Sequence, residues 1–371
     1  MNAQGPIGVR KKVAFIIPGG IGTGNHNIGV PVLQDLVKLL AVDVDITVFS
    51  LFKVNGDFRP QGFILKSIPN KNIFIKCVKL LWYFWHHHRL QQFDVVHGFW
   101  ALPSGFLAAI IGRTFNIKCV VSVLGGDAAS LPSIRYGQLR NTFQRTLVLW
   151  TLRHADECTA LTQFSIDNLI RVGLKKSIKV IPWGVDTARF FMKEKPVTSP
   201  VQFLHIANLT PVKDQSTLLH AFQLISLHVP SMLTIIGEGS AEREVRSLVF
   251  SLGLQERIKF LDAQPYEDLP FWYHNADILL HTSLSEGQSE VVTEAMSCGV
   301  LVCGTRVGLM ADIPEACLVV DVGDFRTLAD EVIKLLDSEP RINELRRKAF
   351  EWATTHSIKW TTERTKELYD T

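Results

Sequence analysis

Two glutamates eight residues apart, Glu286 and Glu294, stand in the segment SLSEGQSEVVTEAMSCG at 283–299. A run typical of a buried strand precedes Glu286, and a small polar turn, Gly287 to Ser289, leads into a predicted helix that begins near Glu290. Glu294 then lies about one turn inside that helix. N–H groups at a helix start favour anions, and an ionised carboxylate accepts hydrogen bonds. The segment therefore indicates a ligand-binding turn in which N–H donors lie beside a carboxylate acceptor.

The spacing alone carries little weight, because Glu331 and Glu339 repeat it further along the chain. Glu331 falls in a predicted surface helix and Glu339 abuts Pro340, so neither stands at a strand-to-helix turn. The context of Glu286 and Glu294 is what selects that pair.

A glycine-rich turn, PGGIGTGNHNIG at 18–29, follows the first predicted strand and precedes a helical pattern that begins at Val30. Its N–H groups suit a diphosphate, with Gly22, Gly24 and Asn27 as the candidate contacts. A nicotinamide dehydrogenase would also need an acidic residue near the end of its second strand, where this chain reads VFS at 48–50. A tight turn without any ligand stays open as the alternative.

Short β-type runs alternate with helical patterns along the whole chain, which is typical of βα units around a parallel sheet. In the first half we predict strands at 13–18, 45–51, 94–99, 119–124, 157–162 and 178–183. Helical patterns lie between them at 30–40, 74–91, 102–113, 139–153 and 163–172. In the second half we predict strands at 201–207, 231–237, 257–261, 276–282, 300–304 and 316–321.

An aperiodic stretch rich in charged, Pro and Ser residues separates the two halves. We predict an α/β protein with two Rossmann-like, doubly wound parallel-sheet domains facing a cleft: residues 1–192, a linker at 193–200, and residues 201–356. Ligands of such sheets bind outside the carboxyl ends of the strands, and both sets of ends can face one shared cleft.

Composition excludes several classes of protein. The 371 residues are 47% apolar, which is enough for two cores, and a net charge of +3 without a basic stripe argues against nucleic acid as a partner. Six scattered cysteines without a CxxC pair argue against zinc and against disulfides, so we expect a cytoplasmic protein.

No signal-peptide pattern precedes the first strand, and the apolar aromatic stretch at 77–85 is too short to cross a bilayer. The segment 76–89 nevertheless joins aromatic and basic residues as interfacial helices do. We consider two interpretations of this segment: peripheral contact with the inner face of a membrane, or packing of a helix on the first sheet.

The segment HTSLSEGQSEVVTEAMSCG at 281–299 is similar to the Glu-x7-Glu signature of family-4 retaining glycosyltransferases. Other segments match the family in the same order: IPWGVDTARF (181–190), NLTPVKD (208–214), IIGEG (235–239), RIKFL (257–261) and YHNADI (273–278). The resemblance spans nearly the whole chain. It implies the glycosyltransferase-B fold, with an N-terminal acceptor domain, a C-terminal nucleotide-sugar domain, and a last helix within 357–371 that crosses back to the first domain.

The resemblance also implies roles for individual residues. Glu294 would bind the donor ribose, Glu286 a hydroxyl of the donor sugar, and Lys213 the diphosphate; the alternative for Lys213 is a solvated loop lysine. The remaining donor-side candidates are Gly287, Gln288, Ser289, Asn208, Gln264, Gly22, Gly24 and Asn27.

The chain departs from the family pattern at three places. Asn208 stands where the family usually has an arginine. Gln288 and Ser289 stand where the family usually has an aromatic residue and a glycine. Leu124, in SVLGGDA at 122–128, replaces a histidine. His97 and Asp127 remain as acceptor-side candidates, and His97 is equally consistent with a packed core residue.

We therefore predict a retaining, hexosyltransferase-type enzyme that uses a uridine or guanosine diphosphate sugar and a glycan, lipid-linked or small hydroxyl acceptor. No cofactor and no metal is expected, because the only Asp-x-Asp pair, Asp43 with Asp45, lies at the wrong end of its strand. A sugar-nucleotide epimerase, a non-catalytic sugar-nucleotide-binding protein and a dehydrogenase remain as alternatives.

Overall fold

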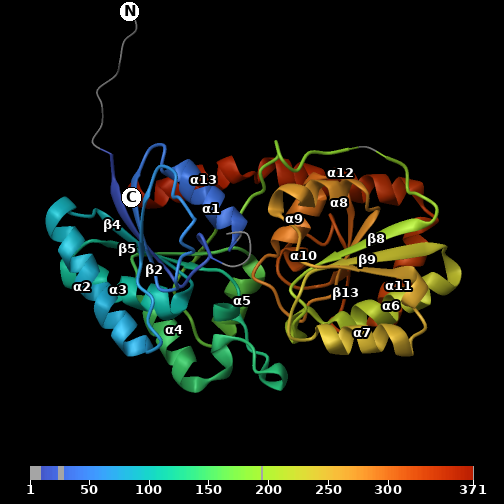
Figure 1. Ribbon diagram of the computed structural model, residues 1–371, viewed down its shortest axis with the longest axis horizontal. Helices are drawn as coiled ribbons and strands as arrows, with labels where there is room; N and C mark the ends of the chain where they lie inside the picture. Colours follow the sequence, from blue (N-terminus) through green and yellow to red (C-terminus); the bar gives the residue numbers. More distant parts are fainter. Residues whose placement is uncertain (1–9, 24–28, 194, 371) are drawn as a thin grey trace, which may run out of the picture.

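A computed structural model of the chain describes residues 10–23, 29–193 and 195–370. Two α/β domains lie side by side, each with a parallel sheet between helices (Figure 1). Every ladder between the named strands is parallel. The predicted fold class is confirmed.

Within the described residues, the N-terminal sheet has seven strands in the order β3-β2-β1-β4-β5-β6-β7. They are β1 (Lys12–Ile17), β2 (Asp45–Ser50), β3 (Ile64–Ser67), β4 (Val95–Phe99), β5 (Lys118–Val123), β6 (Glu157–Ala160) and β7 (Lys179–Val180). The helices of this half are α1 (Pro31–Leu40), α2 (Ile73–Gln91), α3 (Phe106–Phe115), α4 (Thr142–His154) and α5 (Gln163–Arg171).

The described part of the C-terminal sheet has six strands in the order β10-β9-β8-β11-β12-β13. They are β8 (Val201–Ile206), β9 (Ser231–Ile236), β10 (Ile258–Leu261), β11 (Ile278–His281), β12 (Leu301–Thr305) and β13 (Leu318–Val320). The helices are α6 (Gln215–His228), α7 (Glu242–Ser251), α8 (Leu269–His274), α9 (Glu290–Ser297), α10 (Leu309–Asp312), α11 (Phe325–Leu336) and α12 (Glu339–Thr355).

Three elements of the structure differ from the sequence-based prediction. The edge strand β3 was not predicted, because its residues are exposed or half-buried and carry no apolar period. Helix α4 begins at Thr142, not near residue 139, because the Asn141 side chain accepts hydrogen bonds from the N–H groups of Phe143 and Gln144 and caps the helix there. Of the strand predicted at 178–183, only Lys179–Val180 pairs with β6.

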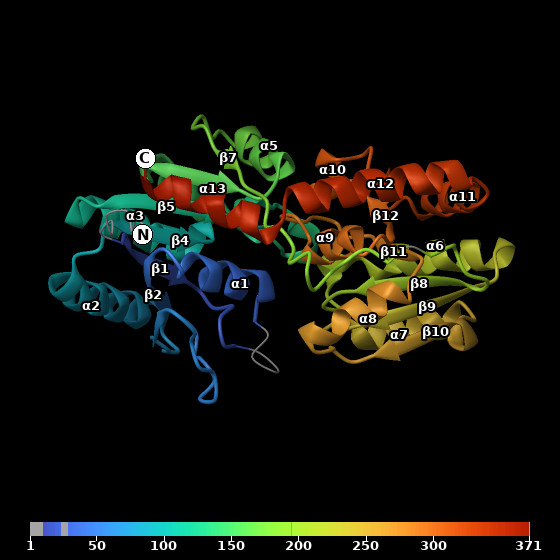
Figure 2. The same ribbon diagram turned by 90° about the horizontal axis from the view of Figure 1, so that it is seen from above.

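The last helix, α13 (Ile358–Asp370), returns to the N-terminal domain and packs against α1, while α12 stays on the C-terminal domain (Figure 2). The chain passes between the two helices close to Gly184, where a Cβ atom would lie 2.1 Å from the carbonyl oxygen of His356. Only glycine fits that approach. Lys366 of α13 pairs with Asp43 at 2.5 Å, and Tyr369 is buried in the N-terminal core.

Candidate functional site

A cavity of about 400 Å³ lies between the domains and is lined from both sides. Trp100 and Leu124, which follow β4 and β5, line it from the N-terminal domain. Asn208 follows β8, Gly237 follows β9, and Glu286 follows β11 on the other side. The carboxyl ends of both sheets therefore meet at this cavity, which is where α/β sheets bind ligands.

Glu286 lies at the floor of this cleft in the turn between β11 and α9. Its Oε1 accepts hydrogen bonds from Lys213 Nζ and from Ser283 Oγ, each at 2.6 Å, and lies 3.3 Å from His281 Nε2. Burial opposes ionisation of Glu286, but the Lys213 charge and the hydrogen bonds from His281 and Lys213 hold its pKa well below the usual value. The group is an anion paired with a cation.

Lys213 ends the short turn that follows β8, and this turn is fastened to the segment before Glu286. The N–H of Leu284 donates to the carbonyl of Val212 at 2.8 Å, and Thr282 Oγ1 donates to the carbonyl of Asp214 at 3.0 Å. Asp214, in a left-handed conformation at φ 45°, caps α6 through Thr217. Lys213 is thus a positioned cation lining the cleft rather than a solvated loop lysine.

Glu294 lies one turn inside α9 and is only 2% exposed. Its Oε2 accepts a hydrogen bond from the Tyr273 hydroxyl at 2.7 Å. Burial raises the pKa of Glu294 to about 7, against the hydrogen bonds from Tyr273 and Tyr266, which favour ionisation. Its carboxyl group can therefore change charge near neutral pH.

Glu290, the first residue of α9, lines the cleft and was not predicted as a site residue. Burial, reinforced by the charge of Glu294, raises the pKa of Glu290 to about 8. The sequence signal that could have identified Glu290 is an acidic residue at the first helical position after the Glu286 turn. It is an unusual neighbour for a diphosphate unless it is neutral.

Gln288 lines the cleft, but both polar atoms of its side chain bond to the other domain. Its Oε1 accepts from the Trp183 N–H at 2.8 Å, and its Nε2 donates to the Trp183 carbonyl at 2.6 Å. Next to it, Thr162 Oγ1 donates to the Gly287 carbonyl at 2.7 Å, and a Cβ at Gly287 would lie 2.1 Å from the Leu124 carbonyl oxygen. The glycine is required by this close contact between domains.

A second interdomain contact joins α10 to the start of α5. The Asp312 carboxylate accepts from the N–H of Gln163 at 2.6 Å and from the N–H of Phe164 at 2.9 Å. It supplies acceptors for two N–H groups at the first turn of a helix in the other domain. Together with the Gln288 contact, it places the α9 turn against the N-terminal domain.

The two acceptor-side candidates lie in the core. His97 is 1% exposed, with Nδ1 2.8 Å from the Tyr369 hydroxyl and Nε2 2.7 Å from Ser122 Oγ, and burial lowers its pKa to about 3. In the structure His97 is therefore a packed core residue, which is the second of the two interpretations made from the sequence. The buried Asp127 carboxylate accepts from the N–H groups of Ala101, Leu124 and Gly125, so it shapes the loop beside the cleft and does not face an acceptor.

The other predicted donor contacts fall in three places. Asn208, Gln264 and Ser289 line the cavity. Gly22 adopts a left-handed φ of 60° against the ring of Phe58 and is not brought to the cavity. Gly24 and Asn27 lie outside the described residues.

Among the described residues, no group of three or more His, Cys, Asp or Glu side chains is arranged to hold a metal ion. Asp43 and Asp45 lie away from the cleft, paired with Lys366 at 2.5 Å and Arg10 at 3.3 Å. In the same part of the chain, no helix combines the length and the apolar character that crossing a membrane requires.

Comparison with protein families gives two adjoining matches. Residues 31–189 match "Glycosyltransferase Family 4", and residues 186–352 match "Glycosyl transferases group 1". Together the two matches span residues 31–352, which include the linker and most of both domains.

Individual proteins show the same similarity. N-acetyl-alpha-D-glucosaminyl L-malate synthase of Bacillus anthracis is 26% identical over 67% of this chain and 67% of its own length. O-antigen chain mannosyltransferase B of Escherichia coli is 28% identical over 87% of this chain and 93% of its own. Among solved structures, Anabaena HepE in complex with UDP-glucose aligns with a TM-score of 0.77 at 18% identity, covering 96% of this chain and 98% of that one.

Proposed function

This chain belongs to glycosyltransferase family 4, whose members transfer a sugar from a nucleotide-sugar donor, and from that premise we propose how its own residues do so. The donor, a uridine or guanosine diphosphate sugar, occupies the cleft with its diphosphate between Lys213 and the start of α9. Glu286 accepts hydrogen bonds from the donor sugar, and Glu294 accepts from the ribose. The observation that carries this assignment is the Lys213–Glu286 ion pair at the floor of the cleft.

Charge complementarity supports the placement of the diphosphate. Lys213 and the N–H groups at the start of α9 both favour anions, and Lys213 lies on the same side of the cavity as that helix start. A unit charge about 4 Å away at an effective dielectric near 20 is worth about 4 kcal/mol. On donor binding, the charge of Lys213 is shared between Glu286 and the phosphate.

In the proposed reaction, a bond forms between the acceptor oxygen and the anomeric carbon on the face that the diphosphate leaves, so the configuration is retained. The bond between that carbon and the phosphate oxygen breaks, and the acceptor proton passes to the departing oxygen. Two carboxylates flanking the bond, as in glycosidases, fit less well, because Glu286 and Glu294 belong to one βα unit. We propose that no metal takes part: Lys213 and the helix start supply the positive potential, and the Asp43–Asp45 pair lies elsewhere.

The acceptor is proposed to approach the cleft surface formed by Trp100, Leu124, Leu161 and Trp183. Two indole rings beside aliphatic side chains suit the apolar faces of a sugar ring. Trp100 also has a φ of 66°, a backbone conformation that bulky residues rarely adopt and that concentrates at functional sites. We therefore assign Trp100 to acceptor binding.

The experiment that tests the donor assignment compares Glu294→Ala with Glu286→Ala. We expect Glu294→Ala to weaken the binding of the nucleoside diphosphate itself, and Glu286→Ala to impair turnover and sugar discrimination while nucleotide affinity stays within about threefold of wild type. Calorimetric titration and product analysis by mass spectrometry provide the two readouts. Equal loss of nucleotide affinity in both variants would refute the division of roles, and an epimerised donor without a glycoside product would make the protein an epimerase.

We also propose that the enzyme works in the cytoplasm, in peripheral contact with the inner face of a membrane through α2. This helix carries apolar residues on its exposed face as well as on its buried face, although it lies at the outer edge of the N-terminal domain, far from the C-terminal domain (Figure 1). Leu80 and Phe84 face the core, yet Phe74, Val78 and Trp82 are each more than half exposed. Helices with apolar residues on all sides are usually buried. We therefore infer that a binding partner covers the exposed apolar face of α2.

Charge identifies an anionic lipid surface as that partner. Residues 58–93 contain six Lys or Arg residues and no Asp or Glu. Basic residues near an anionic leaflet contribute about 1 kcal/mol each, and aromatic side chains favour the interface. Such a contact would place the cleft near a lipid-linked acceptor.

Vesicle sedimentation tests this contact. We expect binding to phosphatidylglycerol vesicles, little binding to phosphatidylcholine vesicles, and a loss of at least fivefold in Trp82→Ser. Phe250→Ser is the matched control, since Phe250 is an aromatic residue on α7 of the other domain and is even more exposed than Trp82, at 73% against 56%. Equal binding to both vesicle types, or unchanged binding of Trp82→Ser, would contradict the proposal.

A further inference from the structure

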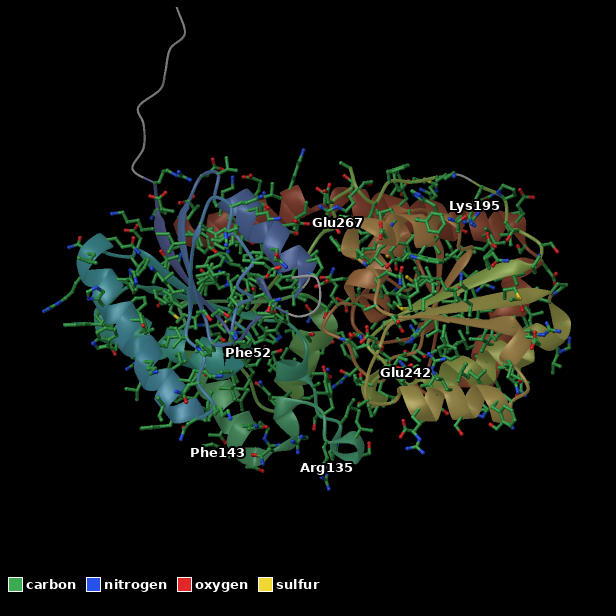
Figure 3. All side chains as sticks on the ribbon, in the orientation of Figure 1. Phe52, Arg135, Phe143, Lys195, Glu242 and Glu267 are labelled. Atoms are coloured by element: carbon green, nitrogen blue, oxygen red, sulfur yellow. The ribbon has the colours of Figure 1, made fainter. Side chains whose placement is uncertain are left out.

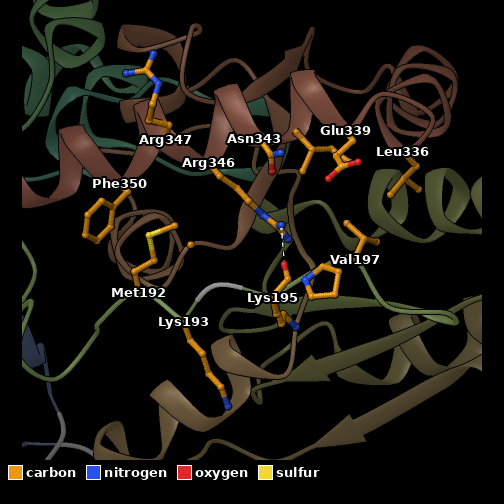
Figure 4. A pocket seen from close by; sticks show the side chains of 13 residues that line it. Met192, Lys193, Lys195, Val197, Leu336, Glu339, Asn343, Arg346, Arg347 and Phe350 are labelled. Carbon is orange, nitrogen blue, oxygen red and sulfur yellow. Dashed lines mark hydrogen bonds between the residues drawn. The ribbon is translucent and has the colours of Figure 1, made fainter.

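A second cavity, of about 980 Å³, lies outside the cleft between the linker and α12. We call it the linker pocket: Met192, Lys193, Lys195 and Val197 line it from the linker, and Leu336, Asn343, Arg346 and Phe350 from α11 and α12 (Figure 4). Lys195 and Glu242 label opposite sides of the C-terminal domain in Figure 3, and the pocket lies on the Lys195 side. Its volume is in the range of pockets that bind small molecules.

Arg346 is the residue that makes this pocket more than a surface hollow. The guanidinium reaches from α12 to the linker, where Nη1 donates to the Lys195 carbonyl at 3.0 Å (Figure 4). The residue is only 9% exposed, and within the described residues neither Nε nor Nη2 has an acceptor. Buried N–H groups in proteins are almost always paired, so two unpaired groups of one cation indicate a missing anion.

The surrounding charges favour an anion. Lys193, Lys195 and Arg347 also line the pocket, against one carboxylate, Glu339. Lys195 Nζ lies 3.2 Å from Asp277 Oδ1 and Arg347 pairs with Glu351 at 2.6 Å, so Arg346 and Lys193 are the cations without an ion-paired carboxylate among the described lining residues, and only Arg346 is buried. Burial lowers the pKa of Arg346, and the nearby charge of Asp277 opposes that shift.

The geometry points to a ligand class. We propose that the linker pocket binds a small organic phosphate, with the phosphate on the free edge of the Arg346 guanidinium. A planar guanidinium edge matches two phosphate oxygens, which a lysine cannot do. The Asn343 amide lies on the same wall as a neutral donor, and Met192, Leu336 and Phe350 provide apolar surface for the organic part.

The position of the pocket connects it to the catalytic cleft. Gly299 follows the last turn of α9 and lines the linker pocket, whereas Glu290 begins the same helix at the cleft. The chain just before the linker is held to α9 as well, since Ser297 Oγ donates to the Phe190 carbonyl. A ligand that holds the linker against α12 therefore restrains the segment that joins the two domains. By linkage, donor and phosphate affinities then change each other by the same factor.

The test is a ³¹P NMR and thermal-unfolding titration of the full chain with glycerol phosphate, with inorganic phosphate as a second probe. It is done at saturating UDP so that the cleft is occupied, and sodium chloride keeps the ionic strength constant. We expect saturable binding of one phosphate, at least tenfold weaker binding in Arg346→Met, and binding within twofold of wild type in the matched control Arg341→Met, an exposed arginine of the same helix that does not line the pocket. Should Arg346→Met fail to fold, Arg346→Lys replaces it, because it keeps the charge and loses the planar edge.

Several results would overturn the site. They are the absence of saturable binding, unchanged affinity in Arg346→Met or Arg346→Lys, and binding that UDP abolishes, which would place the phosphate in the cleft. Failure of the donor assignment leaves this result intact, since the titration reads the linker pocket directly.

Discussion

At the scale of single residues, the turn before α9 and the first turns of that helix hold three glutamates whose environments differ, and two of them, Glu286 and Glu290, line the cleft. Glu286 is held ionised by Lys213 and His281, whereas burial raises the pKa of Glu294 to about 7 and that of Glu290 to about 8. One βα turn thus presents a permanent anion and two groups that titrate in the physiological range. Carboxyl groups separated in this way take different roles in a site.

The first prediction concerns Glu290 and pH. Because its folded pKa is raised, Glu290 is neutral below about pH 8 and ionised above it, where it repels the donor diphosphate. We expect donor affinity to fall about tenfold as the pH rises from 7 to 9, which corresponds to about 1.4 kcal/mol. In Glu290→Gln the fall should be much smaller, and calorimetric titration measures both. An identical pH profile in the variant would remove Glu290 from the donor site.

The second prediction concerns His97. His97→Ala removes an imidazole packed between Phe15 and Phe99 and should lower the free energy of unfolding by about 2 to 4 kcal/mol. Donor affinity of the folded fraction should not change. Urea denaturation and nucleotide titration check the two expectations. A fully stable variant with lost turnover would restore the acceptor-side role.

At the scale of elements, the turn before α9 serves two purposes. Its backbone begins the helix that faces the donor, while Gln288 and Gly287 contact Trp183 and Leu124 of the other domain. The position where the family has an aromatic residue is used here for an interdomain contact. In the proposed donor site, donor binding and contact between the domains are therefore coupled through Gly287 and Gln288.

The third prediction follows from that contact. Gln288→Ala leaves the buried N–H and carbonyl of Trp183 without partners, and one such loss costs about 1 to 3 kcal/mol. We expect a lower urea midpoint and a donor affinity reduced by about threefold to tenfold, because the closed arrangement is less populated. Gln223→Ala, which removes a surface amide contact to Leu252 far from the cleft, is the control. A variant indistinguishable from wild type in both measurements would mean that the Gln288 contact does not hold the domains.

At the scale of the whole molecule, the sequence predicted the two parallel sheets because apolar runs of strand length alternate with helical periods. Edge strand β3 was not predicted because it has no buried face. Glu286, Lys213 and Ser289 were predicted as site residues from the sequence. They line one cavity because their loops follow strand ends. The partners of Gln288 and His97 were not predictable, since Trp183 is 105 residues and Tyr369 272 residues away along the chain. Glu290 was missed because its raised pKa depends on burial against Glu294.

In the proposed donor site, the cleft binds a nucleotide-sugar diphosphate through Lys213 without a metal. Titration of wild type and Lys213→Ala with UDP-sugar and GDP-sugar in EDTA, together with turnover at saturating donor, tests this proposal. We predict that wild type binds one of the two donors in EDTA and that folded Lys213→Ala loses about 10² to 10³ in turnover, as the loss of one donor to a leaving group typically does. Affinity that disappears in EDTA and returns with manganese or magnesium, or a Lys213→Ala loss below about threefold, would contradict the claim.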